Sequence, residues 1–331
     1  MKIGIVVDLS NYRDYFERFR KLTDKTPCIE IHLLDADIVS PEIFFSKIEK
    51  AMVFFREANV RILGIHFLDN VVNNIINFEM FNFEPEFRLL CPTIDLVSEV
   101  EKLDTLLAGA AHASRCLGHK VKVVIHEGVF FKTDLLETFN PIQLKELRGI
   151  YFKRIGGIHA KYFSNSGNEI DICLENSPPF AGSGFSTQHF IDQVIPDITG
   201  RLKPSEKFVF DISHWFMCCE YLRKDERGVL GLDILKDVEI DNILPLNGYD
   251  ILEKISSNVG WIHLNDCSGT DSEHEGLSLF QNNSLVNWER LLKILKLLNA
   301  PMLLEILGSE KDFSLIEKSF FNFKELWCKN N

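Results

Sequence analysis

The amino-acid sequence predicts a (β/α)8 barrel, and three observations lead to this prediction. Eight short apolar runs bounded by turn residues alternate with longer stretches whose apolar residues recur at helical spacing. The runs are nearly continuous in Val, Ile, Leu and Phe, which is typical of strands buried on both faces of a parallel sheet. Strict alternation of strand and helix indicates parallel crossover units, and eight such units close a barrel.

The predicted strands are apolar runs of strand length that end on or near a polar residue. In chain order they span residues 2–9, 27–34, 61–68, 120–129, 169–176, 207–212, 259–265 and 301–306. Ile-His pairs terminate or nearly terminate four of these runs, at 31–32, 65–66, 125–126 and 262–263. Polar residues at the ends of parallel strands are candidates for function, because barrel active sites form there.

The predicted helices lie between these strands and carry apolar residues on one helical face. They span residues 12–22, 41–58, 97–117, 142–163, 187–198, 215–222, 249–256, 286–298 and 313–327. A doubly wound sheet is the rival fold, but it needs no eighth strand and usually has a Gly-rich first turn, where this chain has Leu9-Ser-Asn-Tyr12. We therefore interpret residues 1–331 as one barrel domain whose long loops are 69–94, 223–248 and 267–285.

Composition and charge restrict the classes of partner. With 46% hydrophobic and 25% charged residues the chain has the composition of a globular protein, not of a disordered one. Its net charge of -12 repels phosphate backbones and anionic lipid. We expect a small-molecule substrate, and the charge disfavours a nucleic-acid partner without excluding one. We expect no membrane association, because the most apolar window, 291–307, is interrupted by charges and Pro301. Assembly into a homo-oligomer stays open.

The eight cysteines predict a reducing, cytoplasmic location. None shows C-x-x-C spacing, and several lie inside apolar runs, as reduced core thiols do. The first residues contain an apolar stretch that Asp8 ends too early for a signal peptide. We interpret Cys173, Cys218 and Cys219 as core thiols, because no strongly basic neighbour would lower their pKa.

The last four strands place polar residues at matching depth. Side chains along a strand alternate between the barrel lumen and the helix layer. The residues in question are Glu175, Asp211, His263 and Glu305. If all four face the lumen, three carboxylates and one imidazole converge at its upper end. A single strand-terminal Glu or His is more often a cap or a solvated group, but four in consecutive strands favour a site.

Three buried carboxylates at one point would repel one another and raise each other's pKa. A divalent cation removes this cost. Oxygen-rich ligation with one imidazole suits Mn²⁺, Mg²⁺, Co²⁺ or Zn²⁺. The four residues therefore predict a divalent metal site. On the second strand Glu30 and His32 share one face, and the pattern does not decide which of them reaches this site.

Five motifs in order resemble those of a known superfamily. They are Val-Val-Ile-His-Glu-Gly at 123–128, Ile-Cys-Leu-Glu-Asn-Ser-Pro at 172–178, Phe-Asp-Ile-Ser-His at 210–214, Ile-His-Leu-Asn-Asp at 262–266 and Leu-Leu-Glu-Ile at 303–306. Over about residues 60–310 the set resembles the xylose isomerase-like TIM-barrel superfamily. That superfamily contains sugar phosphate isomerases and epimerases and the endonuclease IV group (AP endonuclease family 2), so the resemblance implies the barrel and a metal site without naming one reaction.

The resemblance also implies roles for single residues. The four strand-end residues named above match the single-metal set of the isomerases and epimerases. His214 matches a residue that contacts substrate in those enzymes and binds metal in the endonucleases, where His66 and His126 match further zinc ligands. The endonucleases complete their cluster with an Asp-x-His motif after the seventh strand. Here Ser272 stands two places before His274, and Asp271 lies one place too early for this motif. Asp271 therefore joins His274 at the site only if the loop is shifted.

Two loops carry further features. Residues 177–186 contain glycines whose backbone N–H groups could approach a substrate phosphate. We favour a turn in which Ser186 or Thr187 caps the next helix, because no Lys or Arg accompanies the motif. The phenylalanines at 78–87 form either an apolar lid or a buried cluster under a long loop.

These observations predict a metal-dependent isomerase or epimerase of a small sugar-like or hydroxy-carbonyl substrate, acting through an enediolate. Glu175 and Glu305 lie across the lumen from each other and are the candidate base and acid, with His214 as a third catalytic candidate. One alternative is an endonuclease IV-like zinc phosphodiesterase acting on abasic DNA, which His66 and His126 favour and the net charge opposes. The other is a barrel without catalysis that binds a metabolite.

Overall fold

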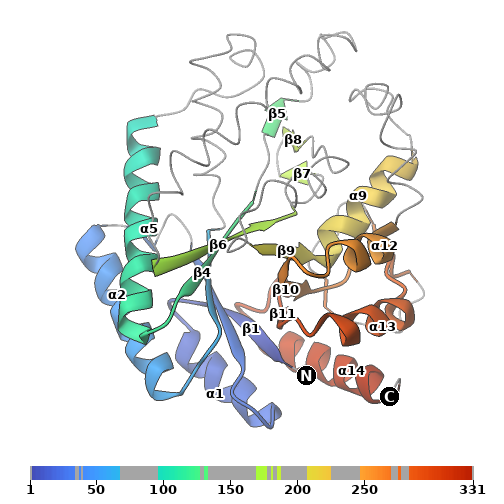
Figure 1. The fold of residues 1–331 in the computed structure, drawn as a ribbon, viewed down its shortest axis with the longest axis horizontal. Helices are drawn as coiled ribbons and strands as arrows, with labels where there is room; N and C mark the ends of the chain where they lie inside the picture. The colour runs from blue at the N-terminus through green and yellow to red at the C-terminus, as the bar shows by residue number, and fades with distance from the viewer. Residues whose placement is uncertain are drawn as a thin grey trace.

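Eight parallel strands close into a barrel surrounded by helices (Figure 1). The structure is a computed structural model and describes residues 2–33, 37–38, 40–67, 96–126, 130–132, 169–176, 180–181, 185–187, 207–224, 247–269, 275–276 and 283–329. The strands follow one another around the barrel in the order β1-β11-β10-β9-β6-β4-β3-β2, and every pairing in the barrel is parallel. The predicted (β/α)8 TIM barrel is confirmed.

Each barrel strand lies within one predicted apolar run. The strands are β1 (Ile3–Asp8), β2 (Cys28–Leu33), β3 (Leu63–Phe67), β4 (Val121–His126), β6 (Ile170–Glu175), β9 (Lys207–Asp211), β10 (Val259–Leu264) and β11 (Met302–Leu304). Strand β11 is the shortest strand of the barrel. Beyond its end, the N–H of Glu305 donates to the carbonyl of Leu264 at 3.3 Å. This bond carries the β11 register one residue further and places Glu305 beside β10.

The described helices cover the outside of the barrel. They are α1 (Tyr12–Leu22), α2 (Pro41–Glu57), α5 (Leu96–Leu117), α9 (Ile212–Lys224), α12 (Asn247–Lys254), α13 (Trp288–Leu298) and α14 (Ser314–Lys329). Helix α2 starts where Ser40 accepts a hydrogen bond from the Ile43 N–H at 3.3 Å, with Pro41 in its first turn. Seven of the nine predicted helices are confirmed, whereas residues 142–163 and 188–198 lie outside the described residues.

Helix α9 begins three residues before its predicted start. The cause is Asp211, the last residue of β9, whose Oδ1 accepts hydrogen bonds from the His214 N–H at 2.7 Å and the Ser213 hydroxyl at 2.9 Å. An aspartate that accepts from the third residue of a helix acts as its N-cap. Asp211 therefore ends a strand and starts a helix, and its carboxylate is held in one orientation.

A second, three-stranded antiparallel sheet follows the carboxyl ends of β4 and β6. It consists of β5 (Phe130–Lys132), β8 (Phe185–Thr187) and β7 (Phe180–Ala181), in that order. Ser186 pairs with Phe131 and Thr187 with Phe130, so both belong to β8, and the helix that they are predicted to cap lies outside the described residues. The local sequence could not show this, since the partner strand comes from a different loop. Figure 1 shows the sheet above the barrel.

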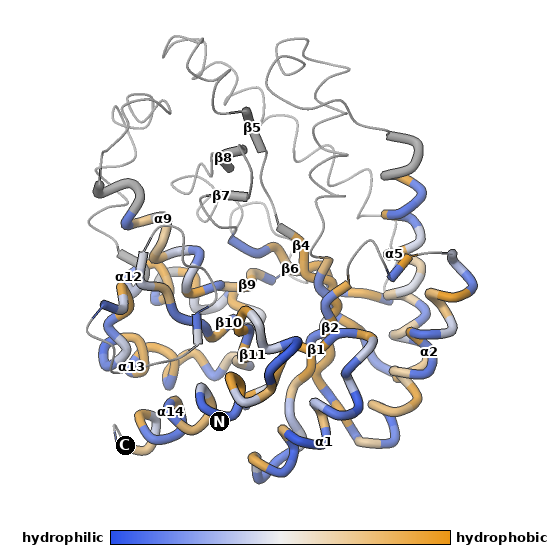
Figure 2. The backbone as a smooth tube through the Cα atoms, turned by 180° about the vertical axis from the view of Figure 1, so that it is seen from behind, coloured by the Kyte–Doolittle hydropathy of each residue, from blue (hydrophilic) through white to orange (hydrophobic). Residues whose placement is uncertain are grey.

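The barrel has two apolar cores. One lies between the strands and the helices and takes the outward-facing residues of each strand, such as Ile5, Ile31 and Ile65. The other fills the lumen; we call it the lower lumen layer, and it consists of Cys28, Val124, Cys173, Val209, Trp261 and Leu303. Gly64 makes room for Trp261, because a Cβ at this position would lie 1.8 Å from the indole ring. Figure 2 shows the apolar strands and the mixed polarity of α1 and α2.

The described cysteines form no disulfide with one another. Cys28, Cys173, Cys219 and Cys267 are buried free thiols. Burial raises the pKa of Cys173 to about 12, which opposes a nucleophilic role. Cys91 and the side chain of Cys218 lie outside the described part of the structure. Among the described residues, no helix is both long and apolar enough to cross a membrane.

Candidate metal centre

Six polar side chains converge in the lumen directly above the lower lumen layer. We call them the upper lumen layer, and they are Glu30, His66, Glu175, Asp211, His263 and Glu305. Their side chains come from five strands and from the residue after β11, and none of the six residues is more than 3% exposed. Five of the six follow a lower-layer residue or Gly64 by two positions in the same strand, as the period of two requires.

The four predicted metal residues meet in this layer. Glu175, Asp211, His263 and Glu305 each offer a donor atom, and these atoms all lie within 4.8 Å of one another. His263 is central: its Nδ1 lies 2.7 Å from Glu305 Oε2, 2.9 Å from Glu175 Oε1 and 3.8 Å from Asp211 Oδ2. The strand pairing of His263 with Asp211 explains their shared depth. The expected convergence of three carboxylates and one imidazole is therefore present.

Glu30 belongs to the site, a point that the strand pattern left undecided between Glu30 and His32. Its Oε1 lies 3.2 Å from His66 Nδ1 and 3.1 Å from His263 Nε2. With His66, His263 and Glu305 it forms a second group of donor atoms within 4.8 Å. The available signal was a carboxylate inside an apolar run, in phase with Cys28. Because Glu30 is fully buried, it belongs to the chemistry of the layer and not to the surface.

His32 also faces the lumen, one step above Glu30. Its Nε2 lies 3.2 Å from Glu305 Oε1 and 3.3 Å from Glu30 Oε1. The side chain is 12% exposed, so it forms part of the rim of the layer. Burial lowers the pKa of His32, but hydrogen bonds to Glu30 and Glu305 outweigh it and raise the pKa to about 9.

The two imidazoles of the upper lumen layer separate its carboxylates. His66 lies between Glu30 and Glu175, with Nε2 3.3 Å from Glu175 Oε2. Burial would lower the pKa of His263, but Glu175, Glu30 and Glu305 together raise it well above the ordinary value. Burial dominates at His66 and lowers its pKa. Positive charge at the centre is what this carboxylate set requires.

Side-chain amides and hydroxyls hold Asp211 in place. Its Oδ2 accepts a hydrogen bond from the Asn265 amide at 2.5 Å, and Oδ1 caps α9 as described above. Asn176 brackets the Asp211 backbone, donating to its carbonyl at 2.9 Å and accepting from its N–H at 2.8 Å. Both oxygens of Asp211 are oriented before any ligand binds, which is the arrangement that a metal-ligating carboxylate needs.

His214, a predicted catalytic residue, lies beside the layer. Its Nδ1 donates to the Asn176 carbonyl at 2.8 Å and lies 3.7 Å from Glu175 Oε1. This bond places the ring proton on Nδ1 in the neutral imidazole, so Nε2 carries the lone pair. His126 ends β4 in register with Glu175, but its side chain lies outside the described residues, as do Asp271 and His274.

The donor set of the upper lumen layer fits a divalent cation. Four carboxylates and two imidazoles, all buried, supply the oxygen and nitrogen atoms that Mn²⁺, Mg²⁺, Co²⁺ and Zn²⁺ bind. Without a cation, the mutual repulsion of the carboxylates is offset only by protonated imidazole. Glu175, Asp211, His263 and Glu305 could hold one ion, and Glu30 with His66 extends the set on the opposite side of His263.

Comparisons with known proteins agree with the barrel. No protein-family model and no curated protein sequence matches the chain. A putative xylose isomerase from Rhodospirillum rubrum is similar in structure with a TM-score of 0.58 and 14% identity, over 99% of both chains. A mannonate dehydratase from Streptococcus suis serotype 2 has a TM-score of 0.55 and 10% identity, over 100% of this chain and 95% of the other. SacUVDE has a TM-score of 0.51 and 13% identity, over 98% and 99%. The chain shares its fold with xylose isomerase-like barrels.

Proposed function

We propose that this protein is a metal-dependent isomerase or epimerase of a small sugar-like or hydroxy-carbonyl substrate. The observation that carries the proposal is the upper lumen layer, in which buried carboxylates surround His263 at the end of the barrel where active sites form. A putative xylose isomerase and a mannonate dehydratase are among the proteins of similar fold, which supports a sugar-like substrate.

The residues that would hold the ion are Glu175, Asp211, His263 and Glu305. A bound divalent ion draws electron density from neighbouring carbonyl and hydroxyl oxygens of a substrate and so acidifies the proton on the adjacent carbon. Asp211 is suited to holding and not to proton exchange, because both its oxygens already accept hydrogen bonds from neighbouring groups.

Glu175 and Glu305 are the proposed base and acid. Two strands, β10 and β9, separate β11 from β6 in the barrel, and the two carboxylates both reach Nδ1 of His263. One carboxylate accepts the proton next to the carbonyl and the other returns a proton to the neighbouring position or the opposite face. The lower lumen layer closes the lumen beneath them with apolar side chains, which keeps water away from the carbanion-like carbon.

Proton exchange in heavy water tests this function directly. The protein is loaded with Mn²⁺, Mg²⁺, Co²⁺ or Zn²⁺ and incubated in D2O with a panel of aldoses, ketoses and hydroxy-keto acids. We expect deuterium at the carbon next to the carbonyl and formation of the isomer or epimer for one member of the panel. Both should disappear on chelation and in Glu175→Gln, while Glu317→Gln, an exchange on the outer helix α14, retains them. Protein with full metal content but no exchange on any substrate would contradict the proposal.

A second candidate is a phosphodiesterase of the endonuclease IV type. The group Glu30, His66, His263 and Glu305 favours it, because it offers a second ion position that shares two residues with the first. The net charge of -12 opposes binding to DNA. Two or three metal ions per chain and cleavage of abasic duplex DNA at physiological salt would establish this candidate in place of the first.

A further inference from the structure

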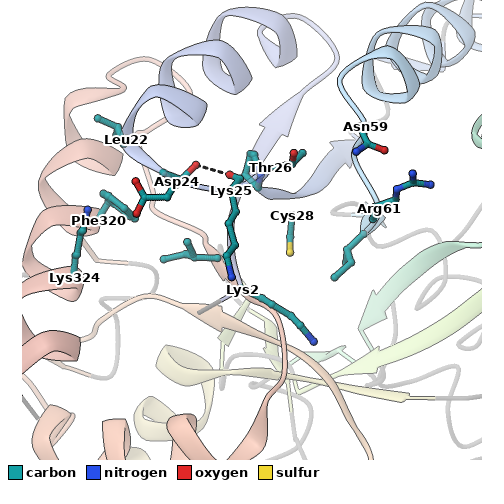
Figure 3. A pocket seen from close by; sticks show the side chains of 14 residues that line it. Lys2, Leu22, Asp24, Lys25, Thr26, Cys28, Asn59, Arg61, Phe320 and Lys324 are labelled. Carbon is teal, nitrogen blue, oxygen red and sulfur yellow. Dashed lines mark hydrogen bonds between the residues drawn. The ribbon is translucent and has the colours of Figure 1, made fainter. Parts of the chain in front are cut away.

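A pocket opens at the end of the barrel opposite the upper lumen layer. Its volume is about 310 Å³, at the lower end of the range for small-molecule sites. The residues that directly precede β1, β2 and β3 line it, together with the end of α1 and one side of α14 (Figure 3). Cys28 reaches it from the lower lumen layer, so the pocket and the acidic cluster lie at the two ends of the same lumen.

The inner wall of this pocket is apolar. Pro27, Cys28 and Phe320 are buried and line it, and Ile62 is half-buried beside them. Phe320 is fixed by an edge-on contact with Phe19, with ring centroids 5.3 Å apart. A pocket whose wall is held by core side chains exists before a ligand arrives, and an apolar group of a ligand would gain free energy by displacing water from it.

The rim of the pocket is basic. Lys2, Lys25, Arg61 and Lys324 line it as exposed residues, against a single carboxylate, that of Asp24. Figure 3 labels Lys2, Lys25, Arg61 and Lys324 among the side chains that line the pocket. The rim thus has four cations and one anion, an excess of positive charge. The whole chain has the opposite excess, with 48 acidic residues against 36 basic ones.

The rim cations form no ion pair among the described residues, whereas some other surface cations do. Elsewhere Lys120 lies 3.1 Å from Asp171, and Arg290 lies 2.9 Å from Asp250. Within the described residues, no carboxylate oxygen lies within 4 Å of the side-chain nitrogens of the four rim cations. The mutual repulsion of the four cations is therefore offset by no ion pair among the described residues, and an anion in the pocket would reduce it.

We propose that this pocket binds a small organic anion that combines a phosphate head with an apolar body. The guanidinium of Arg61 and the ammonium groups of the lysines match a doubly charged head, since Arg binds phosphate through paired N–H groups. The inner wall matches an aromatic or short acyl body. A free sugar phosphate is disfavoured, because its hydroxyl groups gain nothing from contact with the apolar wall of Pro27, Cys28 and Phe320. This site is independent of the proposed isomerase chemistry.

Calorimetric titration with phenyl phosphate tests the proposal. Inorganic phosphate serves as the head alone and phenol as the body alone. We expect saturable binding of phenyl phosphate that is tighter than that of either part and that weakens several-fold between about 50 and 500 mM salt. Lys25→Gln combined with Arg61→Gln should weaken it at least about tenfold, which corresponds to about 1.4 kcal/mol. Both side chains are exposed, so the fold should be retained, as an unchanged thermal midpoint would verify.

Two control variants locate the binding. Lys293→Gln with Lys311→Gln removes two exposed cations outside the pocket and should leave the affinity unchanged. Asp211→Asn alters the upper lumen layer and should also leave it within about twofold. Affinity that survives loss of Lys25 and Arg61, affinity that falls in Asp211→Asn instead, or failure of the wild type to bind phenyl phosphate would each overturn the proposal. None of these results depends on whether the isomerase activity is found.

Discussion

Two neighbouring layers of one lumen differ completely in chemistry. The lower lumen layer consists of thiol, aliphatic and indole side chains, whereas the upper lumen layer consists of carboxylates and imidazoles. Both are buried, and in β2, β6, β9 and β10 a single strand supplies one residue to each. Cys28 and Glu30 are examples, two positions apart on β2. A step of about 7 Å along a strand therefore separates a dry core from a candidate catalytic site.

The two layers together let the barrel tolerate a buried acidic cluster. The lower layer supplies hydrophobic burial and excludes water from below, while the upper layer contributes little to stability unless its charges are balanced. Glu30 illustrates the balance: burial would raise its pKa, but His263, His32 and His66 together lower it. Stability and function are thus assigned to different positions of the same strands, and substitutions should separate them.

The largest effect is expected in the lower layer. Trp261→Ala should lower the free energy of unfolding by about 3 to 5 kcal/mol, because it leaves a cavity against Gly64 that the surrounding strands cannot fill. Urea denaturation monitored by circular dichroism measures this change. Trp327→Ala, at a half-buried position on α14, is the matched control and should cost less. An equal loss for the two would show that the lumen is not the principal core.

Substitutions at two positions of β9 should separate metal binding from stability. Asp211→Asn should weaken binding of a divalent ion at least about a hundredfold, because an amide replaces a ligating carboxylate while its carbonyl still caps α9. Val209→Ala should instead destabilise the fold by about 1 to 3 kcal/mol and leave ion affinity unchanged. Elemental analysis and metal titration, with Asp250→Asn as a surface control, distinguish the two. Full metal occupancy in Asp211→Asn would remove this residue from the metal set.

A smaller chemical change within the upper layer tests proton transfer. Glu175→Asp and Glu305→Asp each withdraw a carboxylate by one methylene, and a displacement on the order of 1 Å can cost roughly a hundredfold in rate while the ion stays bound. Deuterium incorporation next to the substrate carbonyl is the measurement. If both variants keep their metal and exchange at the wild-type rate, neither glutamate is the base, and His214 becomes the leading candidate for the step.

The smallest effect concerns a carboxylate outside the lumen. Burial raises the pKa of Asp266 to about 6, against opposing hydrogen bonds from Ser284, the Cys267 N–H and Trp288. Because the pKa in the fold exceeds the unfolded value of 3.8, the proton stabilises the fold, and this contribution is lost as the pH rises through about 6. The stability of wild type relative to Asp266→Asn should fall by roughly 1 to 3 kcal/mol between pH 4 and pH 7.5.

Urea titrations of both proteins across this range measure the Asp266 effect. A difference that does not change with pH would show that Asp266 ionises in the fold as it does in the unfolded chain. It would also show that a buried carboxylate needs no imidazole neighbour, in contrast to the upper lumen layer, where His66 and His263 accompany Glu30.

The sequence by itself determined the barrel and most of its candidate metal centre. Apolar runs of strand length alternate with amphipathic stretches, and both patterns are local, so the strands and seven helices could be predicted near their observed bounds. The period of two then placed Glu175, Asp211, His263 and Glu305 on one side of their strands. Charge repulsion among three carboxylates was sufficient to predict a cation, because it depends only on their being close and buried.

Only the tertiary structure decided which residues from distant strands meet. Closure of the barrel brings Glu30 against His263, although 233 residues separate them in the chain. Pairing with Phe130 makes Thr187 part of β8, a strand whose partner comes from a different loop. The basic pocket likewise joins Lys2 and Arg61 to Lys324 from the last helix. Local patterns specify the face of an element, but contact between elements depends on the register and curvature of the whole sheet, which no short segment of the chain encodes.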